Sequence, residues 1–215
     1  MFTGIIEETG IVLSITKSSG KCIIAIQAKE VLEGTKVGDS ISVNGICLTV
    51  TRLEREKFLA DVMPETLQRS SLGTLKAGIS IVNLERAMQL GGRFGGHIVS
   101  GHIDGTGKII EMKEDGNSVW YKIKTDTKII RYIIEKGSIT IDGISLTVAG
   151  VDSESFMVSV IPHTRAVTAL SQKGRGDIVN LENDCIGKYV EKLFGEPMNQ
   201  KSIGITKEFL GKYGF

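Results

Sequence analysis

Cysteine, aromatic residues and excess charge are all scarce in this chain of 215 residues. The three cysteines are an odd number and form no Cys-x-x-Cys pair, which predicts reduced thiols in a cytoplasmic protein rather than a disulfide framework. Aromatic residues make up 6% of the chain, and the net charge is +1 with no long run of one sign. A nucleic-acid partner calls for a basic face and stacking rings, so both shortages argue against one.

Long apolar runs are missing as well. No stretch is long enough to cross a bilayer, so we expect no membrane partner. Residues 1–4 begin neither a basic segment nor an apolar one, which predicts that there is no signal peptide. A chain of this length can bury most of the surface that it exposes when unfolded, so its stability does not require disulfides.

The sequence repeats itself. Residues 40–50 and 138–148 are identical at seven of eleven positions, with an offset of 98. Further matches lie at offsets of 97 or 98: Phe58 with Phe156, Pro64 with Pro162, Thr66 with Thr164, Thr9-Gly10 with Thr106-Gly107, and residues 82–85 with 179–182. The chain is therefore a duplicated module, and its function must explain two related sites that are not identical.

Each half predicts six short strands, because short runs rich in β-branched residues are bounded by turn residues. The expected strands are residues 11–15, 22–27, 40–43, 46–51, 58–63 and 79–84, then 108–113, 119–124, 138–141, 144–149, 156–161 and 178–181. Asn44-Gly45 and Asp142-Gly143 are two-residue hairpin signals, since these residues tolerate a positive φ. Six strands without a long helix predict a small closed barrel in each half, which leaves no unpaired edge.

Helical signals are short until the end of the chain. Residues 31–34 predict a helical turn, residues 64–67 a short helix or turn opened by proline, and residues 128–134 a short helix. After Glu182 the period changes to that of an amphipathic helix, capped by Asn183 or Asp184 and ended by Gly195 and Pro197. Its apolar stripe is Ile186, Tyr189, Val190, Leu193 and Phe194, and a second helix is expected from Thr206 with Phe209, Leu210 and Tyr213 on one face. The predicted domains are residues 1–96, 97–185 and 186–215.

His97 and His102 follow a glycine-rich segment. In a strand, residues five apart face opposite sides, so this pair should not chelate one metal ion. For either histidine alone, a hydrogen-bonded structural role has about even odds. A phosphate loop is rejected, because the Gly-Lys-Ser/Thr ending is absent and a strand follows.

Equivalent positions carry the remaining candidates. Cys47 and Ser145 occupy the same place in the two repeats and are either small packed residues or a weak nucleophile or hydrogen-bond donor. Thr49 and Thr147 are either ordinary strand residues or ligand-binding hydroxyls. Asp184 is either a helix cap or a group that orients a hydroxyl such as that of Ser145.

Six segments together resemble the α-chain type of riboflavin synthase over essentially the whole chain. They are Met-Phe-Thr-Gly-Ile-Ile (1–6), Asn-Gly-Ile-Cys-Leu-Thr-Val (44–50), Met-Pro-Glu-Thr-Leu (63–67), Gly-Gly-His-Ile-Val-Ser-Gly-His-Ile-Asp-Gly (95–105), Ile-Asp-Gly-Ile-Ser-Leu-Thr-Val (141–148) and Ile-Pro-His-Thr (161–164). The tail, residues 205–215, is also similar. The sequence departs from the family at Arg165-Ala166-Val167, where Leu and a more polar run are usual.

The resemblance implies an all-β fold of two tandem six-stranded antiparallel Greek-key barrels and a C-terminal helix that forms a homotrimer. It implies that two molecules of 6,7-dimethyl-8-ribityllumazine become riboflavin and 5-amino-6-(D-ribitylamino)uracil by four-carbon transfer, without metal or cofactor. Each barrel would bind one lumazine, and the working site would join the N-terminal barrel of one subunit to the C-terminal barrel of its neighbour. Lumazine synthase is a candidate partner.

The resemblance also implies the site residues. Catalytic roles would fall to Cys47, His102, Ser145 and Asp184, with Asp184 helping Ser145 to activate the nucleophile or water that attacks the acceptor. The N-terminal pocket would use Cys47, Leu48, Thr49, Asp61, Val62, Met63, Pro64, Glu65, Thr66, Gly101, His102 and Ile103. The C-terminal pocket would use Gly4, Ile5, Ile6, Lys136, Ser145, Leu146, Thr147, Ile161, Pro162, His163 and Thr164. Phe2 and His97 would also contact the substrate site.

Two other functions compete with this one. Lumazine-binding fluorescent proteins keep tandem barrels and bind one ligand without turnover, but they lose the two-histidine segment and the long C-terminal helix that this sequence has. A tandem-barrel nucleic-acid binder is disfavoured by the charge balance and the scarce aromatic residues.

Overall fold

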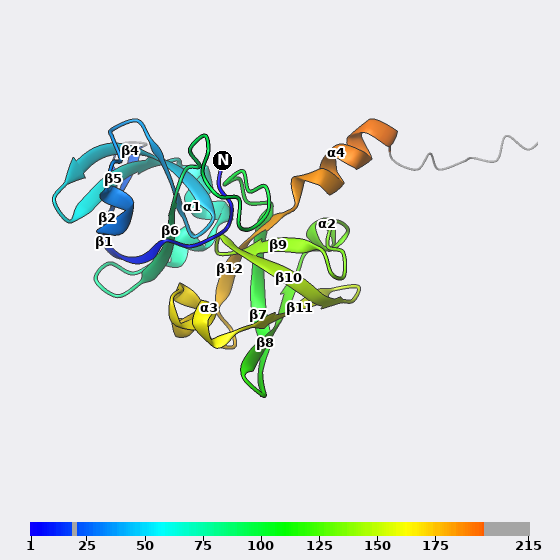
Figure 1. The fold of residues 1–215 in the computed structure, drawn as a ribbon. Coiled ribbons are helices and arrows are strands. Elements are labelled where there is room, and N and C mark those ends of the chain that lie inside the picture. Colours follow the sequence, from blue (N-terminus) through cyan, green and yellow to red (C-terminus); the bar gives the residue numbers. More distant parts are fainter. Residues whose placement is uncertain (19–20, 196–215) are drawn as a thin grey trace, which may run out of the picture. The chain divides into compact units, whose positions relative to one another are not determined.

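The computed structural model describes residues 1–18 and 21–195, and these form two closed antiparallel barrels (Figure 1). The first barrel pairs its strands in the order β1-β2-β5-β4-β3-β6. Its strands are β1 Glu8–Ser18, β2 Lys21–Gln27, β3 Ser40–Val43, β4 Ile46–Glu54, β5 Lys57–Val62 and β6 Ile81–Arg86. This confirms the six strands expected from the first repeat.

The second barrel repeats this order as β7-β8-β11-β10-β9-β12. Its strands are β7 Gly105–Asp115, β8 Ser118–Thr125, β9 Ser138–Ile141, β10 Ile144–Val151, β11 Ser155–Val160 and β12 Ile178–Asn183. Both predicted hairpin turns are confirmed, with φ of 48° and 80° at Asn44 and Gly45 and of 46° and 79° at Asp142 and Gly143. The duplicated sequence therefore folds into two copies of one topology.

Each barrel encloses its own hydrophobic core, because alternate residues of every strand face inward. In β2 the inward positions hold Cys22, Ile24 and Ile26, all buried. In β8 the equivalent row includes Tyr121, a polar exception that is 1% exposed. The two cores are separate clusters, so each half supplies its own burial energy.

Short helices connect the strands. They are η1 Glu30–Leu32, α1 Pro64–Arg69, η2 Ser71–Thr74, α2 Thr127–Ile130, α3 Pro162–Ala166 and η3 Ala169–Gln172. The predicted helix over residues 128–134 is shorter than expected, because Tyr132 and Ile133 donate to carbonyls only three residues back and continue as turns. Sequence reasoning found α1 but missed its repeat, α3.

The two barrels meet around their hairpin turns. A Cβ placed on Gly45 would lie 2.8 Å from the Gly143 nitrogen, so glycine is required for the turns to approach. Asn83 Nδ2 donates to the carbonyl oxygen of Asp142, and Asn180 Nδ2 donates to that of Asn44, at 2.9 and 2.8 Å. These reciprocal bonds give the contact an approximate two-fold symmetry.

A buried charge breaks that symmetry. Asp142 is 1% exposed, and burial raises the pKa of its carboxyl group, an effect that Lys173 only partly offsets. Lys173 Nζ lies 3.5 Å from Asp142 Oδ2 and donates to the Ile178 carbonyl oxygen at 2.8 Å. The first repeat has Asn44 and Leu75 at these two places, so the acid and its cation replace a neutral pair.

The last described helix, α4 Cys185–Phe194, begins a second compact unit that is separate from residues 1–184. Its predicted apolar stripe is exposed at all five positions, from Ile186 to Phe194. The expected second helix from Thr206 lies outside the described residues, and the three predicted domain boundaries stay predictions. Within residues 1–18 and 21–195, no helix has the length and apolar character needed to cross a membrane.

We predict that Lys173→Leu destabilises the protein by about 3 kcal/mol at pH 7, because it strands the Asp142 carboxylate in the interior. The double variant Asp142→Asn/Lys173→Leu should recover most of this loss, since it recreates the Asn44–Leu75 pair. Chemical denaturation of the wild type, Asp142→Asn, Lys173→Leu and the double variant completes a double-mutant cycle and measures the coupling energy between the two side chains.

The pH dependence supplies a control for this experiment. A raised folded-state pKa means that stability falls as pH rises through it, so the loss in Lys173→Leu should shrink in acid. Equal losses in the single and double variants would show that Asp142 does not need its cation.

Candidate binding and catalytic site

Two short segments, which we call straps, are each held by a buried glutamate. The first strap is residues 3–5: Glu85 Oε1 accepts from the Thr3 nitrogen and hydroxyl at 2.7 Å each, and Glu85 Oε2 accepts from the Gly4 nitrogen at 3.0 Å. Burial raises the pKa of Glu85, although these hydrogen bonds oppose the change. The carboxyl group therefore fixes the backbone of the strap.

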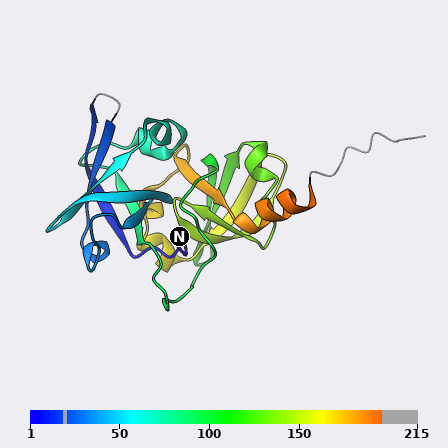
Figure 2. The same cartoon turned by 90° about the horizontal axis from the view of Figure 1, so that it is seen from above.

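The second strap, residues 100–103, repeats this arrangement. Glu182 Oε1 accepts from the Ser100 nitrogen and hydroxyl at 2.7 and 2.6 Å, and Glu182 Oε2 accepts from the Gly101 nitrogen at 3.0 Å. Glu85 belongs to β6 and Glu182 to β12, so the last strand of each barrel holds one strap. In Figure 2 the N-terminus lies between the two barrels, next to residues 87–99, the glycine-rich linker that joins β6 to the second strap.

Each strap then contacts the other barrel. The Cys47 nitrogen in β4 donates to the Gly101 carbonyl oxygen, and the Ser145 nitrogen in β10 donates to that of Gly4, both at 2.8 Å. Gly4 and Gly101 have φ of 78° and 80°, and a Cβ on either would lie 2.7 Å from the facing Cβ. Only glycine permits this approach, so each candidate site combines a strand of its own barrel with a strap tethered to the other.

The N-terminal barrel has a cavity of about 460 Å³ beside its strap. It is lined by Ile46, Cys47, Leu48, Thr49, Asp61, Met63, Glu65, Thr66, Arg69, Gly101, His102 and Ile103. The structure thus brings together β4, the end of β5, α1 and the second strap. Most of the residues that the sequence assigned to this pocket line one cavity.

The cavity offers apolar walls and several polar groups at its rim. Leu48 is buried, whereas Thr49, Asp61 and His102 are exposed and can reach a ligand. Arg69 Nε lies 3.2 Å from Glu65 Oε1, four residues earlier on α1. Sequence reasoning missed Arg69 and Ile46, although the spacing of Glu65 and Arg69 in a helix after Pro64 signals that both point to one side.

Three predicted residues are not among those that line this cavity. Val62 is buried in the first core, and Pro64 opens α1. Phe2 is fully buried and pairs with Val99, and its ring lies against Gly101. Val62 and Phe2 are thus buried next to residues that line the cavity.

In the second barrel, Ser145 stands where Cys47 stands in the first. Its hydroxyl lies 2.8 Å from His97 Nδ1, and His97 is 7% exposed. Burial lowers the pKa of His97, and the charge of Asp184 offsets part of that change. Ser145 Oγ thus has a bond to His97, and the charge of Asp184 acts on that imidazole. The direct pairing of Ser145 with Asp184 that the sequence suggests stays a prediction.

The glycine-rich linker fits closely over this group. A Cβ on Gly96 would lie 2.0 Å from the Thr3 carbonyl oxygen and 3.1 Å from Ser145 Oγ, so position 96 must be glycine. His97 and His102 therefore serve different sites, His97 beside Ser145 and His102 beside Cys47.

The remaining residues predicted for the C-terminal pocket are described by their place in the second barrel, and their part in one pocket stays a prediction. Ile6 and Leu146 pack against the second core, and Ile5 and Thr147 are exposed. Ile161, Pro162, His163 and Thr164 form the start of α3, where residues 63–66 form the start of α1. Lys136 is exposed, and its nitrogen donates to the Val148 carbonyl oxygen.

Comparison with known proteins gives one consistent family. The model of the lumazine binding domain matches residues 3–87 and again residues 100–184. Riboflavin synthase of Actinobacillus pleuropneumoniae is 57% identical over 100% of both chains, and that of Bacillus subtilis (strain 168) is 48% identical over 100% of both. The solved structure of LumP complexed with riboflavin superposes with a TM-score of 0.78 at 25% identity, covering 85% of this chain and 99% of that one.

We predict that Glu182→Gln loosens the second strap and leaves the first in place. The variant puts an amide NH₂ group against N–H donors, so hydrogen exchange at the Cys47 amide should accelerate about tenfold or more. Glu85→Gln is the matched control and should accelerate exchange at Ser145 instead. The cross-tethering would be refuted by exchange that rises at the same amide in both variants. NMR-detected exchange measures both amides.

Proposed function

The chain belongs to the riboflavin synthase family of lumazine-binding proteins, and from this membership we propose how its two barrels divide the reaction between them. The enzyme is a transferase that converts two molecules of 6,7-dimethyl-8-ribityllumazine into riboflavin and 5-amino-6-(D-ribitylamino)uracil. A four-carbon unit passes from a donor lumazine to an identical acceptor, so two like molecules need two like pockets with unlike roles.

The observation that supports this division is the pair of sites with one backbone plan and different side chains. Around the second strap the reactive groups are Cys47 and His102. Around the first strap, Ser145 takes the place of Cys47, and Ile5 takes that of His102. Matching backbones can bind the same heterocycle in both sites, and the differing side chains can give one lumazine the role of donor and the other that of acceptor.

The first cavity suits one lumazine. Its volume falls within the range of small-molecule sites, and its walls are mostly apolar with polar groups at the edge. Backbone groups of β4 and the second strap face the pyrimidine edge, and Thr49 and Thr66 hydroxyls reach the ribityl chain. His102, exposed at the rim, assists proton transfer.

The second site has the groups for general base catalysis. The lowered pKa keeps His97 neutral near pH 7, so its imidazole can take a proton from the Ser145 hydroxyl or from a water that the hydroxyl holds. The charge of Asp184 then favours the imidazolium that results. These groups support the proposal that the attacking nucleophile is activated in the C-terminal barrel.

No metal or cofactor enters this scheme. The 7-methyl group of the lumazine is already acidic, so positioning supplies much of the catalysis. Holding two planar rings face to face can lower the barrier by about 7–11 kcal/mol in favourable cases.

The assembly follows from helix α4. Five apolar side chains on one face of this helix are exposed in the single chain, and such a face is buried in a stable protein. We propose that three copies associate through these faces and that the N-terminal barrel of one subunit meets the C-terminal barrel of its neighbour. The free thiols of Cys22, Cys47 and Cys185 support a cytoplasmic location, and the partnership with lumazine synthase stays a prediction.

Purified protein mixed with 6,7-dimethyl-8-ribityllumazine should develop riboflavin absorbance without any added cofactor. Ser145→Ala and His97→Gln should each lower kcat by about 10² or more with a smaller change in KM, because a general base is lost. The acid limb of the wild-type kcat profile, set below the usual histidine pKa, should disappear in His97→Gln.

Thr51→Ala, on the exposed face of β4, is the matched control and should turn over normally. Tight binding of a single lumazine without turnover would favour a non-catalytic lumazine binder. Unchanged kcat in Ser145→Ala would remove the proposed role of the hydroxyl.

Truncation before Ile186 should convert a trimer to a monomer, because it removes the apolar stripe that the subunits share. Sedimentation or a sizing column with light scattering measures the mass. The monomer should also lose turnover, because the N-terminal barrel of one subunit no longer meets the C-terminal barrel of another. A truncated protein that stays trimeric would refute the role of α4.

A further inference from the structure

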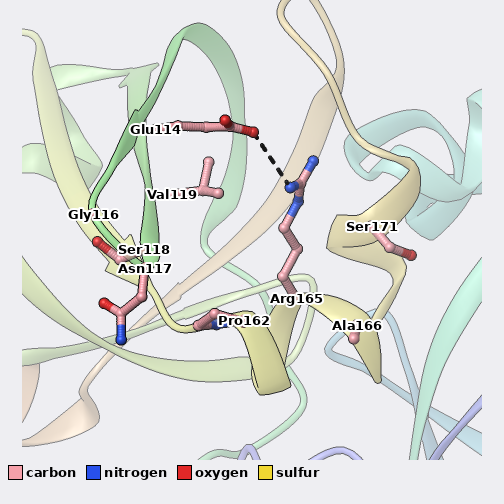
Figure 3. Close-up of a pocket in the computed structure, with 9 residues that line it drawn as sticks. All are labelled: Glu114, Gly116, Asn117, Ser118, Val119, Pro162, Arg165, Ala166 and Ser171. Carbon is pink, nitrogen blue, oxygen red and sulfur yellow. Dashed lines mark ion pairs between the residues drawn. The ribbon is translucent and has the colours of Figure 1, made fainter.

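A second cavity, of about 430 Å³, lies in the C-terminal barrel between α3 and the β7–β8 hairpin (Figure 3). Arg165 extends from α3 toward Glu114, with Asn117 at the tip of the hairpin and Ser171 on the other side. Helix α3 thus takes part in two places: Pro162, His163 and Thr164 belong to the candidate lumazine pocket, and Pro162, Arg165 and Ala166 line this cavity. Nothing in the proposed reaction uses Arg165.

Arg165 replaces a core residue of the first repeat. Its counterpart, Leu67, is buried in the first core, and the strand residue there, Ile24, is apolar. In the second barrel Tyr121 occupies the place of Ile24, its hydroxyl donates to the Leu170 carbonyl oxygen at 3.4 Å, and the nearby Arg165 guanidinium opposes the rise in its pKa. The second repeat thus has arginine and tyrosine where the first has leucine and isoleucine, and the guanidinium group lies at the mouth of the second barrel.

The charge of this guanidinium is incompletely balanced by the described residues. Arg165 is 35% exposed, and its NH1 is 4.0 Å from Glu114 Oε1, too far for a hydrogen bond, while Glu114 is 84% exposed. Arg165 Nε is buried without a hydrogen-bond partner in the described part of the chain. Burial raises the pKa of Tyr121 more than Arg165 lowers it, so the phenol stays neutral near pH 7 and supplies no counter-charge.

The other residues that line the cavity indicate which kind of ligand would fit. Val119, Pro162 and Ala166 give apolar walls, and the Asn117 amide adds one donor near the hairpin. The cavity is of the size that small organic molecules occupy, well above that of a bare ion. A guanidinium fork binds carboxylate and phosphate groups in the plane of two N–H donors.

We propose that this cavity binds a small organic oxyanion, with its phosphate or carboxylate group on Arg165 and its apolar body against Val119, Pro162 and Ala166. The anion binds the side of the Arg165 guanidinium that faces the Glu114 carboxylate, so the two anionic groups compete for the same cation. The cavity shares Pro162 with the predicted C-terminal lumazine pocket, but Arg165 and the hairpin residues belong to neither predicted lumazine pocket. The first barrel has leucine at position 67 in place of Arg165.

Isothermal titration of the full-length protein with phenyl phosphate and with benzoate tests this site, with benzyl alcohol as the neutral control. At least one acid should bind saturably and the alcohol should not, and whichever acid binds more tightly identifies the oxyanion. Arg165→Leu, which restores the residue of the first repeat, should weaken binding about tenfold or more, because the charge-assisted bonds are lost. Glu114→Gln should strengthen it severalfold, because the competing carboxylate is gone.

Arg165→Gln keeps a polar side chain of similar length and covers the case in which leucine disturbs the fold; it should weaken binding as well. Riboflavin in excess during the titration keeps the acids from the two lumazine pockets. Equal affinity in wild type, Arg165→Leu and Arg165→Gln, or the absence of saturable binding by both acids, would overturn the proposal.

Discussion

The exchange of straps between the two barrels is the constraint on which the rest of the structure depends. Glu85 holds residues that complete the Ser145 site, and Glu182 holds residues that complete the Cys47 site. A carboxylate in the interior is costly unless hydrogen bonds satisfy it, and here the strap backbone supplies them. Removing a strap would leave the carboxylate unsatisfied, so the strap and its anchor stabilise each other. Neither barrel can therefore build its site without the other.

Duplication explains why this arrangement can carry two roles. The backbone contacts are kept in both halves: the hairpin turns, the glycines at positive φ and the anchoring glutamates. Divergence is confined to side chains that project from this frame, such as Cys47 against Ser145 and His102 against Ile5. Because the frame fixes where a planar ring would lie, a change of one side chain alters the chemistry and leaves the binding geometry intact. His97 adds a further difference, because it comes from the linker between the barrels and contacts Ser145.

Local features of the fold were predictable from the sequence, and contacts between distant segments were not. The hairpin at Asn44 and the alternation in β2 depend on neighbouring residues, so period and turn chemistry suffice to predict them. The residues of the first cavity were predictable by family resemblance. The bond between His97 and Ser145 was not, because 48 residues separate them and only the closed barrel and the glycine linker bring them together. The shortened α2 and the unpredicted α3 reflect helices of a single turn, whose limits are set by the strands on either side.

The pair Arg165 and Tyr121 shows where such a barrel can accept a charge. A guanidinium in the middle of the core would lose its hydration without compensation. At the mouth of the barrel it can leave its aliphatic stem on the apolar residues and reach a neighbouring phenol, a distant carboxylate and an open cavity. Asp142 is also at the edge of a core, at the contact between the barrels, and Lys173 lies 3.5 Å away as its counter-ion. In both cases the second repeat has gained ionisable groups at the margin of a core that the first repeat keeps apolar or neutral. The asymmetry that catalysis requires near the straps is therefore one part of a wider divergence, which the shared backbone tolerates wherever solvent or a counter-ion lies within reach.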